Sequence, residues 1–537
     1  MSDRAKQIVK RYEKLKGERG TWETHWQEIA ERVLPRYSDT FLSNNITTKG
    51  DKKTDKAIDS TAMLGLERFA AAMESMLTPR NSRWHRLQTT NPALNKDREV
   101  DLFFEEANNV LFRHRYAPQA NYASQQHETY MGLGAFGTGA LFTDKHDQGG
   151  LRYHATNLSE VIFQLNYQGI VDTCYRKFRE SARVMKQKMD AGRYKALPDA
   201  VHAAAEKEPD KEFEVIHCIT PRAEVDPAKV DFRGMKFASY YVSVTDNMEL
   251  SEGGFHSFPY AISRYVTAPG EVYGRSPAMM ALPSIKVLNE QKLTMLKQGH
   301  RVVDPVLLTH DDGVLDTFSL RPGAVNPGGV NAQGQRMVHE LPTGNLAAGQ
   351  ELMDMERQVI NDAFLVSLFQ ILVDTPAMTA TEVLERAREK GALLSPTMGR
   401  QQSEMLGPMI ERELDLLGEQ NLLPPMPQAL IEAEGEFDIV YDSPLTRSQR
   451  AEEAAGWTRT MQIAAEHASI TGDMSGLDHF NMDVIIPELA SINAVPASWM
   501  SSGDEVQGKR DARAQQQQTQ QMIDAAPAAA GLMKATG

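Results

Sequence analysis

Three groups of residues in this chain have types and spacings that occur at nucleotide-binding or catalytic sites. Gly132, Gly134 and Gly137 satisfy the G-x-G-x-x-G pattern, which binds a pyrophosphate when a strand precedes the glycines and a helix follows them. Here the predicted order is reversed, with a helix over 119–131 and a strand over 140–143, so no helix N-terminus would face a phosphate. The pattern therefore predicts a tight, closely packed helix-to-strand turn.

A second group, at 503–509, has the glycine and lysine spacing of a P-loop. The residue after Lys509 is Arg510, whereas coordination of Mg²⁺ needs a serine or threonine at that place. No hydrophobic strand leads into the segment, and low-complexity sequence follows it. We therefore interpret the match as accidental and do not expect the chain to be an ATP-driven motor.

A third group contains Asp304, His310, Asp311 and Asp312, which are residue types found in two-metal nucleases. Such sites need carboxylates on rigid elements around two ions about 4 Å apart, whereas these residues lie in a polar turn that ends at Gly313. The 14 histidines include no H-x-x-x-H pair, and the chain has no G-x-S-x-G motif,. The sequence therefore predicts no enzyme, no cofactor and no metal site.

Composition limits the classes of partner. The chain has 537 residues, of which 58 are basic and 72 acidic, giving a net charge of −14, so contact with DNA would depend on local basic patches. Cys174 and Cys218 are the only cysteines and are expected to be buried thiols in strands, as is typical of a reducing cytosol. We find no signal peptide and no apolar run of about 18 residues, and expect no membrane insertion.

Apolar periodicity predicts a mixed α+β chain that is mainly α-helical. Helices are expected at 3–34, 60–77, 96–116, 119–131, 181–192, 198–206, 277–303, 346–369, after Thr379, and over 445–500. Strands are expected at 140–142, 151–155, 161–165, 170–178, 213–219, 237–244 and 260–266. The strand-rich block lies between two helices, as a small domain does at the tip of a helical hairpin. The Gln- and Ala-rich end, 506–537, is expected to be disordered.

The helix at 277–303 has the clearest local signals. Ser276 can cap it, Pro277 suits its first position, and Asp304 precedes a proline and should end it. From Pro283 to Val303 it would rise roughly 30 Å. Its apolar residues can pack, and its polar residues remain in water, namely Lys286, Glu290, Lys297 and Arg301. A long helix with one face in water suits a spacer or a channel wall.

Four segments carry a family resemblance: Trp22 to Pro35, Tyr273-Gly274-Arg275-Ser276-Pro277-Ala278-Met279, Asp304-Pro305, and Met378-Thr379-Ala380-Thr381-Glu382-Val383-Leu384-Glu385-Arg386. In this order they resemble the head-to-tail connector (portal) proteins of short-tailed double-stranded DNA phages. The resemblance spans roughly residues 1–500. It implies a structural protein with the portal fold of wing, stem, clip and crown, which assembles into a dodecameric ring with a central channel.

The resemblance also implies a division of the chain. The wing would comprise 1–178 and 305–369, the stem helices 179–206 and 271–304, the clip 207–270, and the long kinked helix and crown 379–505. A tunnel loop at 370–378 would include Ile371, Leu372, Val373, Asp374, Thr375 and Pro376. The stem residues beside the DNA channel would be Lys286, Glu290, Lys297 and Arg301.

The resemblance implies that the ring is the conduit for DNA packaging and ejection at one capsid vertex. Its partners would be copies of itself, double-stranded DNA, a terminase motor, tail adaptor or tail proteins, and capsid and scaffolding proteins. It would be assembled in the host cytoplasm and reside in the virion. Two alternatives stay open: a DNA-packaging enzyme such as a terminase nuclease or ATPase, and another virion structural protein such as a tail-tube subunit.

Overall fold

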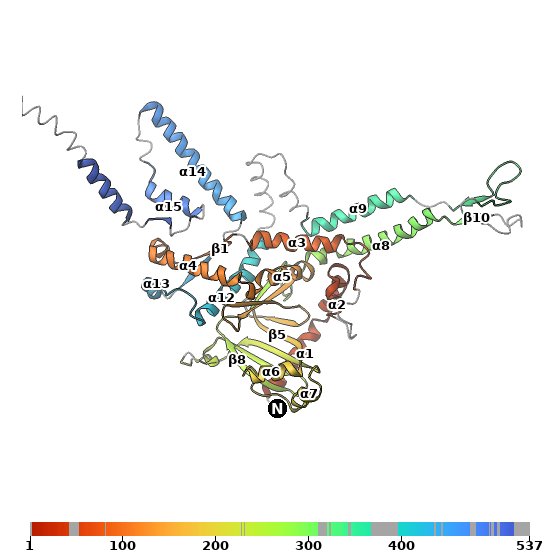
Figure 1. Cartoon of the computed structure of the whole chain (residues 1–537), viewed down its shortest axis with the longest axis horizontal. Coiled ribbons are helices and arrows are strands. Elements are labelled where there is room, and N and C mark those ends of the chain that lie inside the picture. The colour runs from red at the N-terminus through yellow and green to blue at the C-terminus, as the bar shows by residue number, and fades with distance from the viewer. Residues whose placement is uncertain are drawn as a thin grey trace, which may run out of the picture.

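The structure is a computed structural model of the 537-residue chain. It describes residues 3–41, 53–80, 82–226, 228–229, 231–309, 319, 321, 324–341, 345–366, 396–433, 436–441, 444–472, 479–492, 495, 499–501 and 505–519. The fold of these residues is mixed α+β and mainly helical, as the sequence predicts. Figure 1 shows a central body, an arm that projects from it, and a group of C-terminal helices on the other side of the body.

The helices are α1 (Asp3–Glu18), α2 (Gly20–Val33), α3 (Thr61–Leu77), α4 (Arg98–Arg115), α5 (Tyr122–Phe136), α6 (Ala182–Asp190), α7 (Asp199–Lys207), α8 (Pro277–Val303), α9 (Leu346–Ala363), α12 (Gly407–Glu419), α13 (Gln428–Glu432), α14 (Pro444–Thr471) and α15 (Met482–Ile492). The strands are β1 (His85–Thr89), β2 (Thr138–Lys145), β3 (Leu151–Ala155), β4 (Val161–Leu165), β5 (Val171–Ser181), β6 (Glu212–Pro221), β7 (Phe237–Ser243), β8 (Met248–Phe255), β9 (Tyr260–Arg264), β10 (Leu307–Thr309), β11 (Val338–Glu340) and β12 (Phe437–Tyr441).

The two larger sheets of the body are antiparallel. One has the order β3-β2-β9 and the other the order β4-β5-β6-β7-β8. The prediction of a separate strand block over 207–270 is therefore wrong. Its strands β6, β7 and β8 continue the sheet that β4 and β5 begin, and its last strand, β9, pairs with β2 instead. Long-range pairing of this kind leaves little trace in the local sequence pattern.

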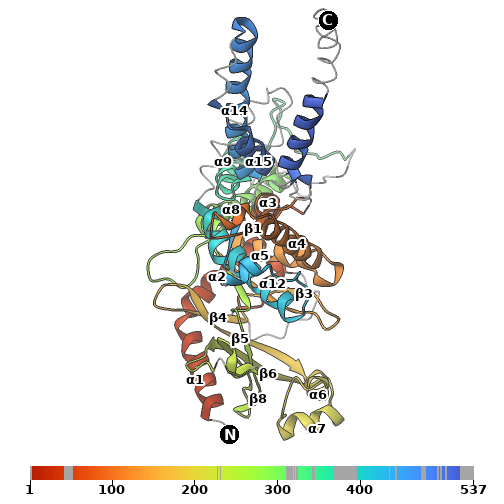
Figure 2. The same ribbon diagram turned by 90° about the vertical axis from the view of Figure 1, so that its left-hand side faces the viewer.

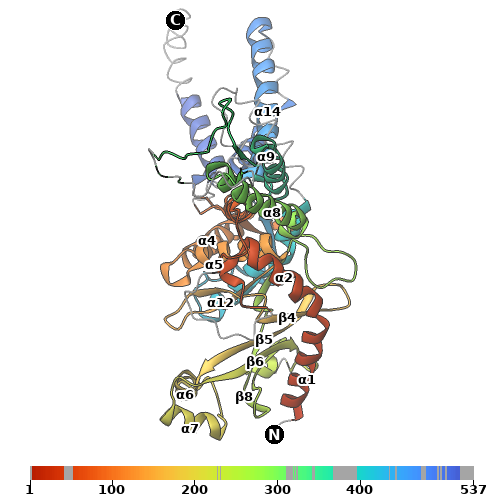
Figure 3. The ribbon, with the colours of Figure 1, turned by 90° about the vertical axis from the view of Figure 1, so that its right-hand side faces the viewer.

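Helices cover both faces of the five-stranded sheet (Figures 2 and 3). Tyr12 of α1 packs with Ile216 on one face, and Met185 of α6 and Val201 of α7 pack with Val215 on the other. Neighbouring strand residues point to opposite faces, so Val215 and Ile216 belong to different clusters. The sheet is thus the middle layer of an α/β/α sandwich at one end of the body.

The two helices expected at 181–192 and 198–206 are confirmed, but they do not form one continuous helix over 179–206. Strand β5 extends to Ser181, α6 ends at Asp190 and α7 begins after Pro198. Gly192 has φ +71°, a left-handed conformation that stops a helix at little cost. Every residue from 179 to 207 is described, and none belongs to a helix longer than nine residues.

The main core surrounds the three-stranded sheet. It contains Trp26 of α2, Leu66 of α3, Trp84, and Ile410 and Leu416 of α12, each at most 1% exposed. Strand β12 pairs with β1. The sequence prediction assigned 379–505 to a long helix and crown, but within that range residues 396–441 belong to the body. Distant parts of the chain therefore share one core.

A buried ion pair joins α4 to α12 inside this core. Arg115 Nε donates to Glu413 Oε1 at 3.1 Å, Arg115 Nη2 also reaches the second carboxylate oxygen, and both side chains are 0% exposed. Tyr153 donates its hydroxyl to the same carboxylate, and His85 Nε2 lies 2.8 Å from Arg115 Nη1. Burial, and then the Arg115 charge, lower the pKa of His85 well below its usual value, so neutral Nε2 accepts the hydrogen bond.

The arm consists of α8, α9 and the short β10–β11 ladder between them (Figure 1). α8 runs outward and α9 returns beside it, with Met295 packed on Gly349. Most of the described residues in 305–369, the range that the resemblance assigns to the wing, extend away from the body in this arm. Gly65 of α3 packs against Phe364, which fastens the end of α9 to the body.

The C-terminal helices α14 and α15 contact each other and project away from the arm (Figure 1). Residues 505–519 are also helical, so the prediction of disorder from 506 onward is wrong for 506–519, and 520–537 lie outside the described residues. Within the described part of the chain, no helix is both long and apolar enough to cross a membrane.

Candidate nucleic-acid interface

The arm begins at a closely packed junction. Ser276 Oγ accepts a hydrogen bond from Met279 N at 3.0 Å and donates to Ala135 O at 2.8 Å. A Cβ on Gly274 would lie 2.2 Å from Gly137 O, and Gly137 itself has φ +76°. The predicted cap of α8 is thus confirmed, and the packing around it needs glycine on both sides.

The glycine pattern at 132–137 forms this same junction. Gly132 and Gly134 lie inside α5, and Gly137 ends it before β2 begins. A Cβ on Gly134 would lie 2.6 Å from Leu66 Cδ1. The predicted close packing and helix-to-strand turn are confirmed at Gly137, but the helix extends to Phe136 instead of ending at 131.

α8 changes its surroundings halfway along its length. Its buried residues all lie between Pro277 and Asn289, whereas Glu290 to Val303 are half-buried or exposed. The predicted end at Asp304 is confirmed, with the Asp304 N–H bonded to His300 O at 2.8 Å. About 14 residues of α8 therefore extend beyond the body, a length of roughly 21 Å.

The four residues predicted to face a channel occupy one side of this helix. At about 100° per residue, Lys286, Glu290, Lys297 and Arg301 fall within an arc of about 60°, and Met295, which contacts α9, lies opposite them,. All four side chains are exposed. The arm therefore presents one polar face that α9 does not cover.

Lys286 differs from the other three because it lies at the base of the arm. Its Nζ is 2.7 Å from Glu28 Oε1 of α2, and this hydrogen bond is the main cause of the lowered pKa of Glu28. Among the described residues, Glu290, Lys297 and Arg301 have no ion-pair partner. The projecting part of the polar face thus carries two cations and one anion.

The sequence analysis missed the cluster that holds the arm to the body. Asn289 Oδ1 accepts hydrogen bonds from the backbone N–H groups of Ile58 and Asp59, both at 2.8 Å. Asp59 Oδ2 lies 3.1 Å from Lys292 Nζ of α8 and 3.1 Å from Arg357 Nη2 of α9. Both helices of the arm therefore converge on the short segment that precedes α3.

Asp59 is ionised in this setting. Burial alone would raise the pKa of its carboxyl group, but hydrogen bonds from Thr61, Lys292 and Arg357 outweigh that effect and lower the pKa well below its usual value. Asp59 Oδ1 accepts from Thr61 N at 2.8 Å and from the Thr61 hydroxyl. The available sequence signal was Asp59-Ser60-Thr61, a run of capping residue types before a helix.

The predicted tunnel-loop residues lie outside the described residues, namely Ile371, Leu372, Val373, Asp374, Thr375 and Pro376. The predicted helix start at Thr379 does so too. On the far side of this gap, residues 396–419 are helical, with a π-helical turn over Gln402–Leu406 directly before Gly407-Pro408. The π-helical turn agrees with the proline after it, because Pro408 cannot donate a backbone hydrogen bond.

The other sequence motifs show no assembled chemical site. Gly508 and Lys509 lie inside a helix, whereas a P-loop needs a loop there. Asp304 ends α8, and His310, Asp311 and Asp312 lie outside the described residues. Among the residues that the structure describes, no three His, Cys, Asp or Glu side chains gather as metal ligands would.

The two cysteines are buried in β5 and β6, as predicted. Burial raises the pKa of the Cys218 thiol to about 12 and that of the Cys174 thiol well above its usual value. Both thiols therefore stay protonated and unreactive at neutral pH.

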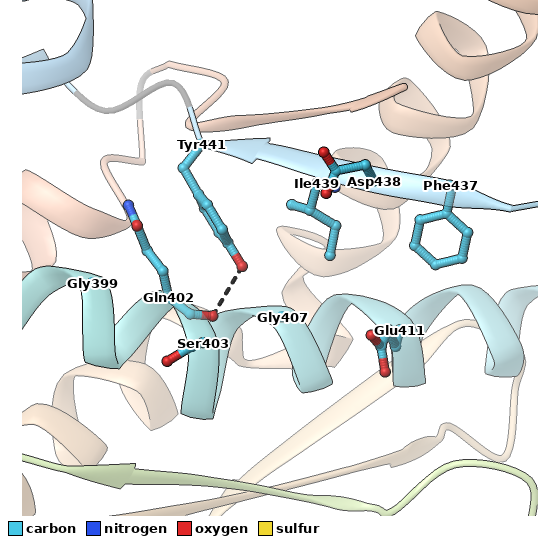
Figure 4. Close-up of a pocket in the computed structure, with 9 residues that line it drawn as sticks. All are labelled: Gly399, Gln402, Ser403, Gly407, Glu411, Phe437, Asp438, Ile439 and Tyr441. Atoms are coloured by element: carbon cyan, nitrogen blue, oxygen red, sulfur yellow. Dashed lines mark hydrogen bonds between the residues drawn. The ribbon is translucent and has the colours of Figure 1, made fainter. Parts of the chain in front are cut away.

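A shallow pocket of about 350 Å³ lies between the helix at 399–411 and β12 (Figure 4). The Tyr441 hydroxyl donates to Gln402 O at 3.0 Å across it. Its carboxylates are Glu411 and Asp438, and burial, followed by the charge of Asp415, raises the pKa of Glu411. The lining residues include no histidine or cysteine.

Comparison with known proteins identifies the family. The family model described as bacteriophage head to tail connecting protein matches residues 5–500. The chain is 29% identical over 525 residues to the probable portal protein of Bordetella phage BPP-1, covering 96% of this chain and 92% of the relative. It is 27% identical over 534 residues to the portal protein of Salmonella phage epsilon15, covering 97% and 93%. This chain therefore belongs to the family of bacteriophage head-to-tail connecting (portal) proteins, which are structural rather than enzymatic.

Proposed function

We propose that copies of this chain assemble into a closed ring, a dodecamer, at one vertex of the phage capsid. The ring surrounds a channel through which double-stranded DNA enters during packaging and leaves during ejection. The observation that carries this proposal is the arm, where two helices leave the body together and expose apolar side chains to solvent.

The apolar surface of the arm indicates a missing neighbour. On α9, Leu352, Met355 and Val359 are 53%, 62% and 51% exposed and share one side of the helix. Their spacing of three and seven residues is that of a helix face that packs against another element. A side-by-side copy would cover this face, and repetition of the same heterologous contact closes into a ring when the rotation permits.

The shape of the arm supports a revised division of the chain. In this division α8 and α9 are the stem, and 304–345 between them is the clip that meets the packaging motor and later the tail. The body, including both sheets and α12, is the wing. The segment 367–395 contains the tunnel loop, and the residues from 444 onward form the crown. We revise the boundaries because the helices within 179–206, α6 and α7, are only nine residues long.

The dimensions of such a ring suit duplex DNA. About twelve helices spaced about 8–10 Å apart give a circle near 35 Å in diameter, measured between helix axes. Subtracting a helix width of about 10 Å leaves a bore near 25 Å. Duplex DNA is roughly 20 Å across, so it passes with room for water, whereas six subunits would be too tight.

The polar face of α8 suits a surface over which DNA slides. Glu290, Lys297 and Arg301 give each copy a net charge of only +1 on that face. Phosphate binding strengthens with each cation that neutralises a phosphate, so a strongly basic wall would hold the duplex. Mixed charges favour brief contacts with the phosphates and leave the driving force to a separate motor.

The proposed partners follow from this role. They are further copies of the chain, double-stranded DNA, a terminase motor, tail adaptor or tail proteins, and capsid and scaffolding proteins, with the virion as location. Membership of the connector family argues against the packaging-enzyme and tail-tube alternatives.

Native mass spectrometry of the purified chain, combined with electron microscopy, tests the proposal. We expect closed rings of one dominant size with a central opening of about 25 Å. A chain that stayed monomeric under every assembly condition would contradict it, as would hydrolysis of ATP by the purified protein.

A further inference from the structure

The attachment of the arm to the body combines two kinds of contact. Ile360 and Phe364 are buried against the body, with Phe364 on Gly65 of α3, and apolar contact of this kind has no preferred direction. The bonds to Asn289 and Asp59 are directional, and those between charged groups are the strongest of their class. The first half of α8, up to Asn289, is also embedded in the core, so the polar bonds add a directional restraint at the point where α8 leaves the body and tie α9 to that direction.

These bonds meet at one place. The backbone at residues 58 and 59 binds Asn289, and one carboxylate oxygen of Asp59 binds both Lys292 and Arg357. The other carboxylate oxygen is bound to Thr61 at the start of α3. Asp59 thus links one body helix to both arm helices through a single side chain, which is only 5% exposed.

The number of copies in a ring is sensitive to small angles. Successive copies turn by about 30° in a ring of 12 and by about 28° in a ring of 13. A tilt of about 2° over the roughly 21 Å of α8 beyond Asn289 moves its tip by less than about 1 Å. A change smaller than the length of one hydrogen bond therefore separates adjacent ring sizes.

We propose that Asp59 is a positioning residue that fixes the angle between the arm and the body and thereby selects the number of copies in the ring. This inference rests on the ring assembly proposed above. Asp59 binds no DNA and forms no contact between copies. It acts by holding α8 and α9 in the orientation that allows one ring size to close.

The test compares ring sizes of full-length variants by native mass spectrometry. Asp59→Asn keeps an oxygen for Thr61 but removes the charge that binds Lys292 and Arg357. Arg357→Gln removes the contact with Asp59 and an ion pair with the exposed Asp354 of the same helix, so it leaves the cap on α3 intact, and because Arg357 is 32% exposed the variant is expected to fold. In both variants we expect the ratio of minor to dominant ring sizes to rise about tenfold, as a loss of about 1.4 kcal/mol would produce.

Glu404→Gln is the matched control, because Glu404 forms a two-bond ion pair with Arg264 at 2.8 and 2.9 Å entirely within the body. It should lower the melting temperature and leave the ring sizes unchanged. An equal spread of sizes in Glu404→Gln would overturn the inference, as would wild-type sizes in folded Asp59→Asn and Arg357→Gln. Folded Asp59→Asn and Arg357→Gln variants that formed no rings would overturn it too. The contacts at Asp59 would then be needed for assembly itself and not for the choice of ring size. Failure of the wild-type chain to form rings would instead count against the proposed function.

Discussion

The two carboxylates that join distant segments of this chain differ in what surrounds them. Glu413 lies in the body, where it and Arg115 are 0% exposed. Asp59 lies at the base of the arm, where it is buried but its partners Lys292 and Arg357 are about one-third exposed. Water can replace a lost partner at the arm but not in the core. We infer that the body holds the fold together, and we expect loss of the contacts at Asp59 to change the orientation of the arm without unfolding the chain.

The largest loss of stability is expected from Glu413→Gln, which leaves the Arg115 cation in the core without a counter-charge. Breaking a buried pair in this way costs about 3–5 kcal/mol, and chemical denaturation should show a loss of that size. A double variant, Arg115→Met with Glu413→Leu, should recover part of the stability, because Tyr153 and His85 would still lack their partners,. A loss below about 1 kcal/mol in the single variant would show that the pair is not a main support of the body.

Val359→Asp should separate assembly from folding. The substitution adds a charge to the exposed apolar face of α9, so burial against a second copy becomes costly, while the monomer keeps its core. Native mass spectrometry should show loss of rings with an unchanged circular dichroism spectrum. Gln358→Asp adds the same charge at the neighbouring exposed position, away from the apolar face, and should still form rings. Normal rings from Val359→Asp would exclude this face as the contact.

Deletion of residues 371–377 should leave both the body and the arm assembled. If these residues form the tunnel loop, the deletion impairs DNA packaging or retention, which can be measured as DNA per particle after complementation of a portal-deficient phage. Loss of the ring itself would count against the assignment of this segment.

The smallest effect is expected from Lys297→Gln combined with Arg301→Gln. Both side chains project from the arm without an ion-pair partner among the described residues. Removing them should leave ring size and stability unchanged and should weaken the salt dependence of DNA retention, because fewer phosphates would be neutralised. Retention that kept its full dependence on ionic strength would argue that this face does not meet DNA.

The sequence predicted those features that depend on near neighbours. Ser276, Pro277 and Asp304 set the limits of α8, and the structure has the helix between them. Gly137 marks a helix-to-strand turn because its backbone is left-handed, which glycine adopts at little cost. Gly274 is needed as well, because a Cβ there would lie 2.2 Å from Gly137 O. These signals act over a few residues, so a single sequence contains them.

Predictions from the sequence were wrong where segments far apart in the chain contact each other. The partner of α8 is α9 and not a helix at 179–206, and β6 to β8 extend a sheet begun by β4 and β5. The bonds from Lys292 and Arg357 to Asp59 join residues more than 200 positions apart. No local pattern reveals such contacts, because they arise only when the core has formed. Helical spacing predicted that Lys286, Glu290, Lys297 and Arg301 stay in water, and the family resemblance suggested their channel role, but neither revealed the cluster around Asp59.

A reconstruction of the assembled wild-type ring by electron microscopy tests the central claim most directly, because it locates the arm relative to the ring axis. The account predicts that α8 and α9 surround the axis and that the five-stranded sheet lies at the outer edge. A ring in which that sheet lined the opening while the arms pointed outward would contradict it.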